Sequence, residues 1–246
     1  MSIETEADWV GLREVGRVVR LTLDAMAAAV RPGVTTAELD RIASGVLTRL
    51  GARSAPAMVY GFPGTVLISI NDEVVHGVPG PRRIAAGDIV KLDVTLEKNG
   101  YIGDAARTVL VEPASDLAMR LRACAEAAFA RAAAVARAGV RVNEIGRVVD
   151  REVRRCGFAV ARGLAGHGIG RTIHEPPHVA NEYDPRQAEI LTEGLVITIE
   201  PMVIAGSGHV VTDRDGWTVR ARDGGLASHH EHTLVVTRGA PVLLTA

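Results

Sequence analysis

The two halves of this chain repeat one another, and this repeat constrains the fold more than any other feature. Five residues recur at a constant offset of 106 positions: Arg31, Gly33, Val34, Glu38 and Arg41 as Arg137, Gly139, Val140, Glu144 and Arg147. Gly51 recurs as Gly157 at the same offset, and segment 87–93 recurs as 194–200 at an offset of 107. Chance matches would not keep register over roughly sixty residues. We therefore expect two α+β halves related by a pseudo-twofold axis.

Each half has the pattern of two helices followed by strands. Residues 5–30 have the apolar spacing of an amphipathic helix that ends at Pro32-Gly33, and a second helix runs from Thr35 or Thr36 to Leu50. Between positions 58 and 110 short β-rich runs alternate with glycine and proline turns. The second half repeats this order, with helices at 115–137 and 143–156 and then strands to 244. Because no linker interrupts the pattern, we expect a single domain over 1–246 with halves of about 1–112 and 113–246.

Composition excludes several classes of partner. A hydrophobic fraction of 47% over 246 residues supports a large buried core. The net charge is −1 without blocks of like charge, so we expect neither nucleic acid nor a charged membrane surface as partner. There is no apolar run of transmembrane length and no signal-peptide pattern, and the two cysteines match no CxxC spacing. We expect a reduced, soluble, cytoplasmic protein whose partner is small.

Two acidic residues occupy equivalent points of two similar strands. In segment 89–96 the alternating apolar residues share one face, so Asp93 points to the opposite face. Segment 195–200 has the same alternation and places Glu200 opposite its apolar face. The two halves are therefore expected to direct these acids into a shared central cleft.

Three further residues complete a candidate metal-ligand set: Asp104, His167 and Glu231. Four carboxylates and one imidazole in one site are hard to explain without metal. A hydrolytic dinuclear site needs oxygen donors that bridge two divalent ions about 3.5–4 Å apart, so that a shared water loses a proton near neutral pH. Four carboxylates also roughly neutralise two divalent cations. One histidine among acids suits Mn, Fe(II), Co or Zn, and ligand type alone does not choose among them.

Six sequence motifs occur in the order found in methionine aminopeptidases of type I. They are Ser69-Ile-Asn-Asp-Glu-Val-Val-His76-Gly-Val-Pro79, Leu92-Asp93-Val-Thr, Gly103-Asp104, Gly166-His167-Gly-Ile-Gly-Arg-Thr-Ile-His174-Glu-Pro-Pro, Thr198-Ile-Glu200-Pro and Glu231-His-Thr. The chain resembles this family over nearly its whole length. The resemblance implies an α+β pita-bread fold, in which two pseudo-twofold-related ααββ halves form a curved antiparallel sheet covered by helices.

The resemblance also implies how the ligands divide between two ions. Asp93, Asp104 and Glu231 would bind one metal, and Asp104, His167, Glu200 and Glu231 would bind the other. Asp104 and Glu231 would then bridge the pair. The implied cofactors are two divalent ions, which would be Co, Mn, Fe(II) or Zn.

Three residues acquire catalytic roles by the same resemblance. Glu200 would act as general base on the bridging water. His174 would hydrogen-bond the scissile carbonyl and stabilise the oxyanion, and His76 would contact the substrate near the newly formed amine. Both histidines should face the substrate rather than bind metal.

A thioether side chain needs a pocket with apolar and aromatic walls. By position the candidates are Phe62, Leu67, Ile173 and Trp217, although the two aromatic residues could equally be core residues. The chain departs from commoner members at two points, with Ile173 where an aromatic is frequent and Tyr60 where a histidine is frequent. These departures bear on pocket shape and rate rather than on the reaction class.

The remaining histidines are interpreted as surface or packing residues. They are His178, His209, His229, His230 and His232. The pair at 229–230 directly precedes Glu231, so we expect it at most to influence that ligand without binding the metal itself.

The implied function is hydrolysis of the N-terminal methionine from nascent proteins and small peptides, with a small second residue. We expect a cytoplasmic monomer that works near the ribosome, with no basic tail that predicts direct docking. Two alternatives stay open: a proline-specific dimetal peptidase, and a non-catalytic binding module with the same fold. Only about thirty residues precede the first repeat unit, which disfavours the former, and the complete ligand set disfavours the latter. The 26 positions between His174 and Glu200 leave no room for the helical insertion of type II members.

Overall fold

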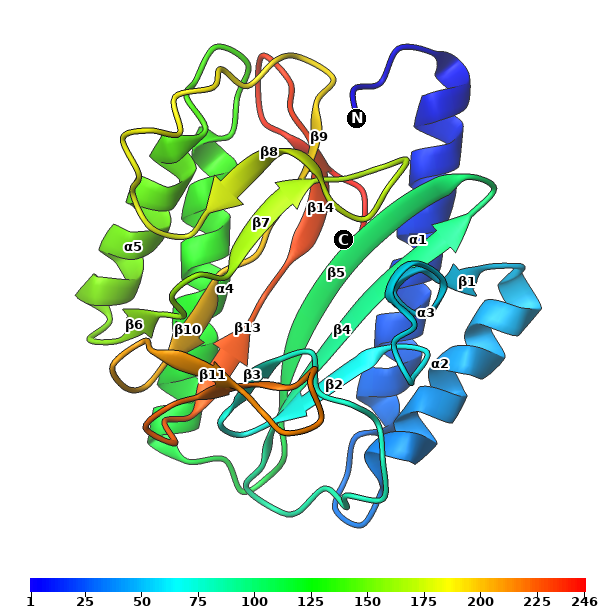
Figure 1. Cartoon of the computed structure of the whole chain (residues 1–246), viewed down its shortest axis with the longest axis vertical. Coiled ribbons are helices and arrows are strands. Elements are labelled where there is room, and N and C mark those ends of the chain that lie inside the picture. The colour runs from blue at the N-terminus through cyan, green and yellow to red at the C-terminus, as the bar shows by residue number, and fades with distance from the viewer.

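Curved antiparallel strands run through the middle of the molecule, and one pair of long helices packs behind each half of them (Figure 1). This computed structural model describes residues 1–246. Helices α1 and α2 cover the N-terminal strands and α4 and α5 the C-terminal ones. The helices are α1 (Glu6–Ala29), α2 (Thr36–Leu50), α3 (Ala55–Tyr60), α4 (Asp116–Val135) and α5 (Asn143–Arg155). This is the α+β architecture that the repeat predicts.

All pairings between named strands are antiparallel. The N-terminal half contributes β1 (Arg53–Ser54), β2 (Leu67–Ile70), β3 (Glu73–Val75), β4 (Ile89–Lys98) and β5 (Tyr101–Leu110). The C-terminal half contributes β6 (Ala159–Val160), β7 (Ala165–Gly168), β8 (Glu175–Ala180), β9 (Val196–Ile199), β10 (Met202–Ile204), β11 (Val210–Thr212), β12 (Val219–Ala221), β13 (Ala227–His229), β14 (His232–Val235) and β15 (Val242–Leu243). Two sheets dominate: β4 pairs with β1, β2 and β5, and the other has the order β15-β14-β9-β7-β8.

The long helices begin and end where the sequence predicts. Thr5 and Thr35 each form a capping box at the start of α1 and α2, so their side chains satisfy backbone N–H groups that the helix leaves free. Gly51 ends α2 in the left-handed conformation. The expectation of β structure from position 58 was wrong for the first residues, because Ser54 caps a short helix, α3, that Pro56 starts and Gly61 ends.

The repeat is visible in matching backbone contacts of the two halves. Two pairs of hydrogen bonds correspond: Gly33 N to Ile84 O and Gly139 N to Leu191 O, each 2.8 Å, and Gly87 N to Val111 O and Gly194 N to Val236 O, each 2.9 Å. The four glycines have positive φ angles between 83° and 91°. Identical residues at the predicted offsets therefore make identical turns, and a glycine is required there because side chains strain that backbone region.

Each half has its own hydrophobic core. Buried residues of α1 and α2 pack on β4 and β5, and those of α4 and α5 pack on β9, β10 and β14. No helix of this chain is both long enough and apolar enough to cross a membrane.

The halves join where β5 meets the start of β14. Ala106 and Glu231 exchange backbone hydrogen bonds of 3.3 and 3.0 Å. The Thr233 hydroxyl donates to Asp104 O (2.7 Å) and accepts from Asp104 N (2.9 Å). This junction places acidic residues from opposite halves side by side.

Candidate active site

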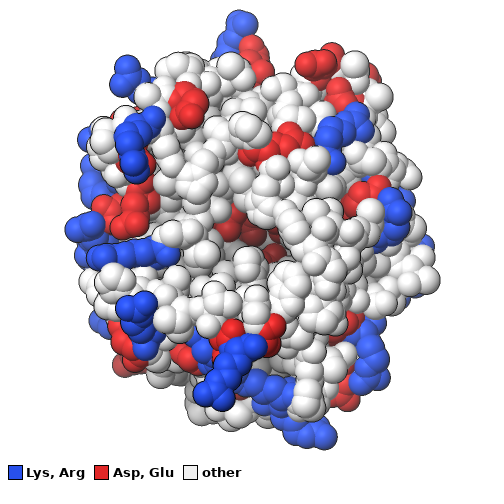
Figure 2. Space-filling view, viewed as in Figure 1, with Lys and Arg blue, Asp and Glu red and all other residues white.

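A cavity of about 600 Å³ opens over the junction of the two halves. Acidic side chains lie at the bottom of the hollow in the centre of the face shown in Figure 2. Every residue that the sequence predicts for the site lines this one cavity: Phe62, Leu67, His76, Asp93, Asp104, His167, Ile173, His174, Glu200, Trp217 and Glu231. Residues that span most of the chain are thus brought together, in a volume typical of small-ligand sites.

Asp93 and Asp104 come from the paired strands β4 and β5. Their register sets Asp104 opposite Thr95 and Asp93 opposite Ala106, so both carboxylates lie on the cavity side. A Thr95 hydroxyl hydrogen bond supports the Asp104 carboxylate. Both acids are buried, with exposed fractions of 8% and 6%.

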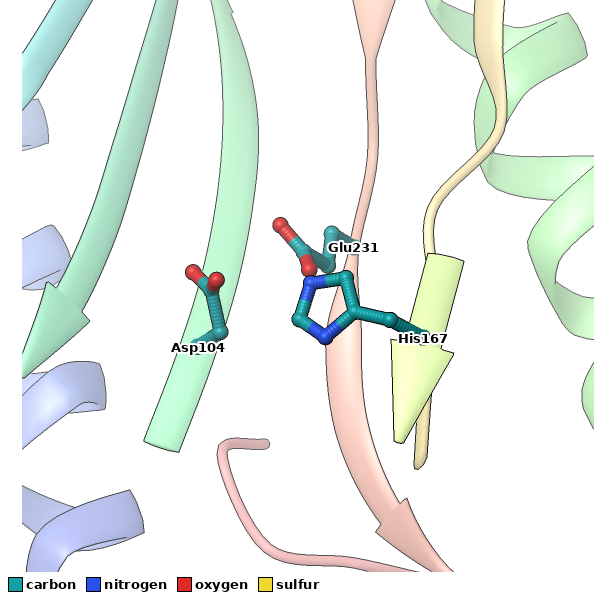
Figure 3. Close-up of side chains that lie close together, drawn as sticks. All are labelled: Asp104, His167 and Glu231. Atoms are coloured by element: carbon teal, nitrogen blue, oxygen red, sulfur yellow. The ribbon is translucent and has the colours of Figure 1, made fainter. Parts of the chain in front are cut away.

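His167 projects from β7 with its ring directed between Asp104 and Glu231 (Figure 3). Glycines flank it because a Cβ at Gly166 would lie 2.6 Å from Thr198 O, and one at Gly168 would lie 2.2 Å from Pro176 O. The ring Nδ1 lies 2.9 Å from Gly168 O, and since a carbonyl only accepts, Nδ1 carries the proton. Burial lowers the pKa of His167 to about 4, so the ring is neutral and Nε2 keeps a free lone pair.

Glu200 follows β9 and is held by its neighbours. The Thr198 hydroxyl donates to its Oε1 (2.9 Å) and accepts from His167 N (3.1 Å). The Asn181 amide donates to Glu200 O (3.0 Å). Thr198 therefore couples the position of the general-base candidate to that of the imidazole, whose Nε2 is 3.5 Å from Glu200 Oε1.

The four carboxylates share a dry environment that opposes their ionisation. Burial raises the pKa values of Asp93, Glu200 and Glu231 well above their ordinary range, and charged acidic neighbours raise them further. Burial also raises the pKa of Asp104 to about 6, and its Oδ1 has no hydrogen-bond partner. Four adjacent acids without a compensating cation would be costly.

The donor set fits divalent metal. Two groups have ligand atoms that all lie within 4.8 Å of one another: Asp104, His167 and Glu231, and Glu200, His229 and Glu231. Glu231 belongs to both groups, which is the arrangement that a bridging carboxylate requires. Asp93 is in neither group. It is nevertheless close to the cluster, because the charges of Asp104 and Glu200 raise its pKa.

Of the surface and packing roles that the sequence leaves open for His229, the structure excludes the surface role. His229 is only 1% exposed and its Nε2 lies 3.7 Å from Glu231 Oε2 and 3.9 Å from Glu200 Oε2. The sequence feature that could have indicated this location beside the acids is the position of His229 two residues before Glu231, at the end of a strand. By contrast, His230 and His232 pack against Phe129, and His209 is exposed.

The two substrate-facing histidine candidates line the cavity above the acids. His76 has a φ of 60°, which is unusual outside glycine, and the next residue, Gly77, donates its N–H to the Ser69 hydroxyl of β2 (3.0 Å). His174 stands 4.3 Å from the His167 ring, centre to centre, and its Nδ1 is 2.6 Å from the Tyr60 hydroxyl. Desolvation raises the pKa of Tyr60 and lowers that of His174, so a neutral phenol donates to a neutral imidazole. The Nε2–H of His174 is then the group free to donate.

Aromatic and aliphatic side chains form the wall of the cavity. Phe62 and Trp217 meet edge to face with ring centres 5.3 Å apart. Leu67 and Ile173 line the same cavity and are nearly buried. The four predicted pocket residues thus supply an apolar surface beside the acidic floor.

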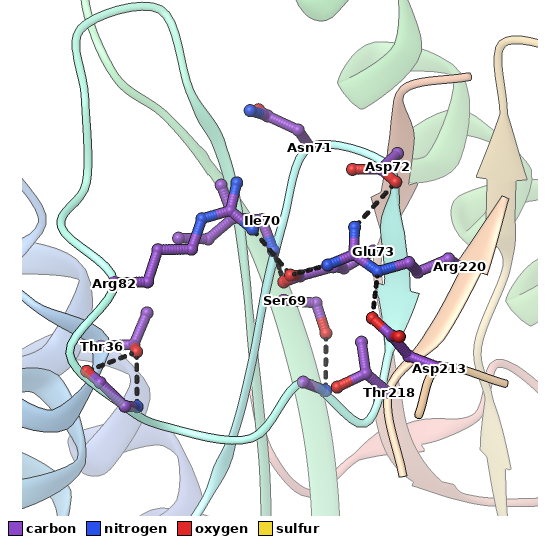
Figure 4. A network of polar contacts seen from close by, with 12 residues as sticks. Thr36, Ser69, Ile70, Asn71, Asp72, Glu73, Arg82, Asp213, Thr218 and Arg220 are labelled. Atoms are coloured by element: carbon purple, nitrogen blue, oxygen red, sulfur yellow. Dashed lines mark hydrogen bonds and ion pairs between the residues drawn. The ribbon is translucent and has the colours of Figure 1, made fainter. Parts of the chain in front are cut away.

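An ionic network fixes the two loops that carry His76 and Trp217 (Figure 4). Arg220 on β12 pairs with three acids: Asp72 (2.8 Å), Glu73 (2.9 Å) and Asp213 (2.7 Å). Arg82 adds a 2.6 Å contact to Glu73. Because β12 pairs with β3, this network ties the β11–β12 loop to the segment that leads into His76.

Comparison with known proteins agrees with this geometry. The model of metallopeptidase family M24 matches residues 10–238. Methionine aminopeptidase 2 from Bacillus subtilis is 39% identical over 100% of this chain and 99% of its own length. The crystal structure of methionine aminopeptidase from Rickettsia prowazekii superimposes with a TM-score of 0.96 at 34% identity, covering 100% of both chains. A prolidase from Pyrococcus furiosus shares the fold alone, with a TM-score of 0.80 at 22% identity over 65% of that longer chain.

The acid-rich cavity, the full-length similarity to methionine aminopeptidases and the match to the family model all indicate the same family. The chain belongs to metallopeptidase family M24, and within it to the methionine aminopeptidases.

Proposed function

We propose that this enzyme is of type I and removes the N-terminal methionine from nascent proteins and small peptides whose second residue is small. One observation carries the proposal: an apolar pocket and a buried cluster of four carboxylates and an imidazole share a single cavity. The pocket suits a thioether side chain, and the cluster suits two divalent ions. Asp93, Asp104, His167, Glu200 and Glu231 would hold them.

Bound divalent ions would polarise the scissile carbonyl and lower the pKa of water at the site. Glu200 accepts the proton of the attacking water and returns it to the leaving amine. The Thr198 hydroxyl holds the Glu200 carboxylate in place for this role. The peptide bond breaks, the new C–O bond forms, and free methionine leaves with the added hydroxyl.

His174 donates its Nε2–H to the carbonyl oxygen as negative charge develops there. Tyr60 acts as a positioning residue, because its hydroxyl fixes the orientation and tautomer of the His174 ring. His76 holds the substrate near the amine that forms. Among ions, Mn, Fe(II), Co and Zn all fit a set of mixed carboxylate and imidazole ligands.

The methionine side chain lies against Phe62, Leu67, Ile173 and Trp217 in this proposal. Ile173 contributes an aliphatic side chain to this wall at a position where an aromatic one is frequent in the family. A branched or larger second residue would crowd the cavity mouth, which gives the preference for small ones.

We further propose that the enzyme is a monomer in the cytoplasm, where nascent chains emerge from the ribosome. On the face shown in Figure 2, Lys and Arg side chains are interspersed with Asp and Glu side chains, and the net charge of the chain is −1. This charge pattern supports brief encounters with emerging chains rather than stable docking. Light scattering after size-exclusion chromatography tests the monomer, for which the expected mass is 26.0 kDa.

Peptide selectivity tests the reaction itself. Chelator-stripped protein, with Mn, Fe(II), Co or Zn added back, should release methionine from Met-Ala-Ser. It should act far more slowly on Met-Leu-Ser, and not on Lys-Pro-Ser. Preferential cleavage of the prolyl peptide would move the enzyme to the proline-specific relatives, and no cleavage with any metal would leave a binding module.

A further inference from the structure

His229 at the end of β13 is a buried imidazole with no partner in the protein. Its exposed fraction is 1%, and neither Nδ1 nor Nε2 makes a hydrogen bond. Buried polar groups are nearly always paired, so such a ring needs a ligand of another kind. It does not line the cavity, which means that it lies behind the carboxylates rather than against a substrate.

The distances from His229 Nε2 identify the kind of ligand. They are 3.7 Å to Glu231 Oε2 and 3.9 Å to Glu200 Oε2. Both are too long for hydrogen bonds, which need about 2.7–3.2 Å. An ion bound about 2.1 Å from each ligand atom separates those atoms by at most roughly 4.2 Å, so each distance leaves room for an ion between the nitrogen and that carboxylate.

Glu200 is consequently flanked by two imidazoles. Its Oε1 faces His167 Nε2 at 3.5 Å and its Oε2 faces His229 Nε2. His167 has its Nδ1 committed to a carbonyl, which leaves Nε2 for the site. The second imidazole occupies the other side of the same carboxylate, within the group of Glu200, His229 and Glu231.

We propose that His229 is a sixth metal ligand, which binds through Nε2 to the ion shared by Glu200 and Glu231. This inference adds a ligand to the metal centre of the proposed peptidase and rests on that proposed function. A second nitrogen donor favours the borderline ions Fe(II), Co, Ni and Zn over Mn, which prefers oxygen. The centre of this chain should therefore discriminate more strongly against Mn than a site of four carboxylates and a single histidine would.

Proton NMR of the Co(II)-loaded protein tests the coordination directly. Each imidazole bound through Nε2 to paramagnetic Co(II) gives one strongly shifted, exchangeable Nδ1–H resonance. The wild-type protein should show two such resonances, and His229→Gln only one. A single resonance in the wild-type protein overturns the proposal without any variant.

Calorimetric titration supplies the affinity. The His229→Gln variant should bind Co(II) about 10- to 100-fold more weakly and Mn(II) with a smaller loss. The exposed His209→Gln variant, which also removes one imidazole, should match the wild type. Equal Co(II) affinities for the His229→Gln variant and the wild type would contradict the assignment.

If His229→Gln fails to fold, His167→Gln replaces it and should retain one shifted resonance, that of His229. Its loss of all shifted resonances would overturn the proposal. None of these measurements uses a peptide. Two resonances in a protein that cleaves no methionyl peptide would refute the proposed function alone, whereas cleavage with one resonance would refute the sixth ligand alone.

Discussion

Asp104→Asn should stabilise the metal-free protein, although it removes a proposed metal ligand. Burial raises the pKa of Asp104 from 3.8 to about 6 in the folded state. A folded pKa above the unfolded one means that this group favours folding at low pH. That contribution is lost as pH rises from about 4 through about 6. At pH 8 the buried carboxylate therefore opposes folding.

The size of the effect follows from the shift. About two pKa units at roughly 1.36 kcal/mol each give about 3 kcal/mol at pH 8. Removing this charge also relieves Glu200 and Glu231, whose pKa values Asp104 raises, and this acts in the same direction. At pH 4 the carboxyl is largely protonated and the variant should differ little from the wild type.

Urea unfolding with a chelator, at pH 4 and at pH 8, measures the difference. Expected is a gain of about 3 kcal/mol for Asp104→Asn at pH 8 only, with the order reversed when Co(II) or Mn(II) replaces the chelator. Glu126→Gln, which removes an exposed acid of α4, is the control and should change stability by less than about 0.5 kcal/mol. A loss of stability for Asp104→Asn at pH 8, or the same difference at both pH values, would refute the reasoning.

Four other outcomes follow from the site. Glu200→Gln should lower kcat about 10²- to 10⁴-fold because the proton acceptor is lost, measured as methionine release at saturating metal. His174→Ala should lower kcat about 10²- to 10³-fold, while Tyr60→Phe should lower it less and leave KM unchanged; equal effects of the two would contradict a positioning role for Tyr60. Trp217→Ala should reduce kcat/KM about 10- to 100-fold through weaker side-chain binding, which a peptide with N-terminal norleucine should share. Arg220→Ala should cost about 1–3 kcal/mol in denaturant unfolding by leaving Asp72 and Asp213 without a cation and Glu73 with Arg82 alone, and an unchanged midpoint would show that the network is dispensable.

The sequence predicts much of this fold because the repeat and the turn chemistry are local. Gly33 and Gly139 need no tertiary information to be recognised as positions of positive φ, and Thr35 marks its helix start by its own side chain. The short helix α3 was missed because six residues carry too little periodicity to outweigh the β-rich run that follows.

The residues of the site show the same contrast between what local sequence predicts and what depends on tertiary packing. The proposed ligands Asp93 and Glu200 could be found because strand alternation fixes the face of each side chain. His229 could not be placed in this way. It lies at a strand end beside two other histidines, and only the tertiary position of Glu200 distinguishes it from them. The support of Glu200 by Thr198 and Asn181 likewise depends on how β7, β8 and β9 pack.

Anomalous X-ray diffraction from crystals soaked in Co(II) tests the central claim most directly. The account predicts two peaks at the floor of the cavity, about 3.5–4 Å apart, with Asp104 and Glu231 between them. A single peak away from these carboxylates, or none at the floor of the cavity, would contradict a dinuclear centre built by the two halves of the chain.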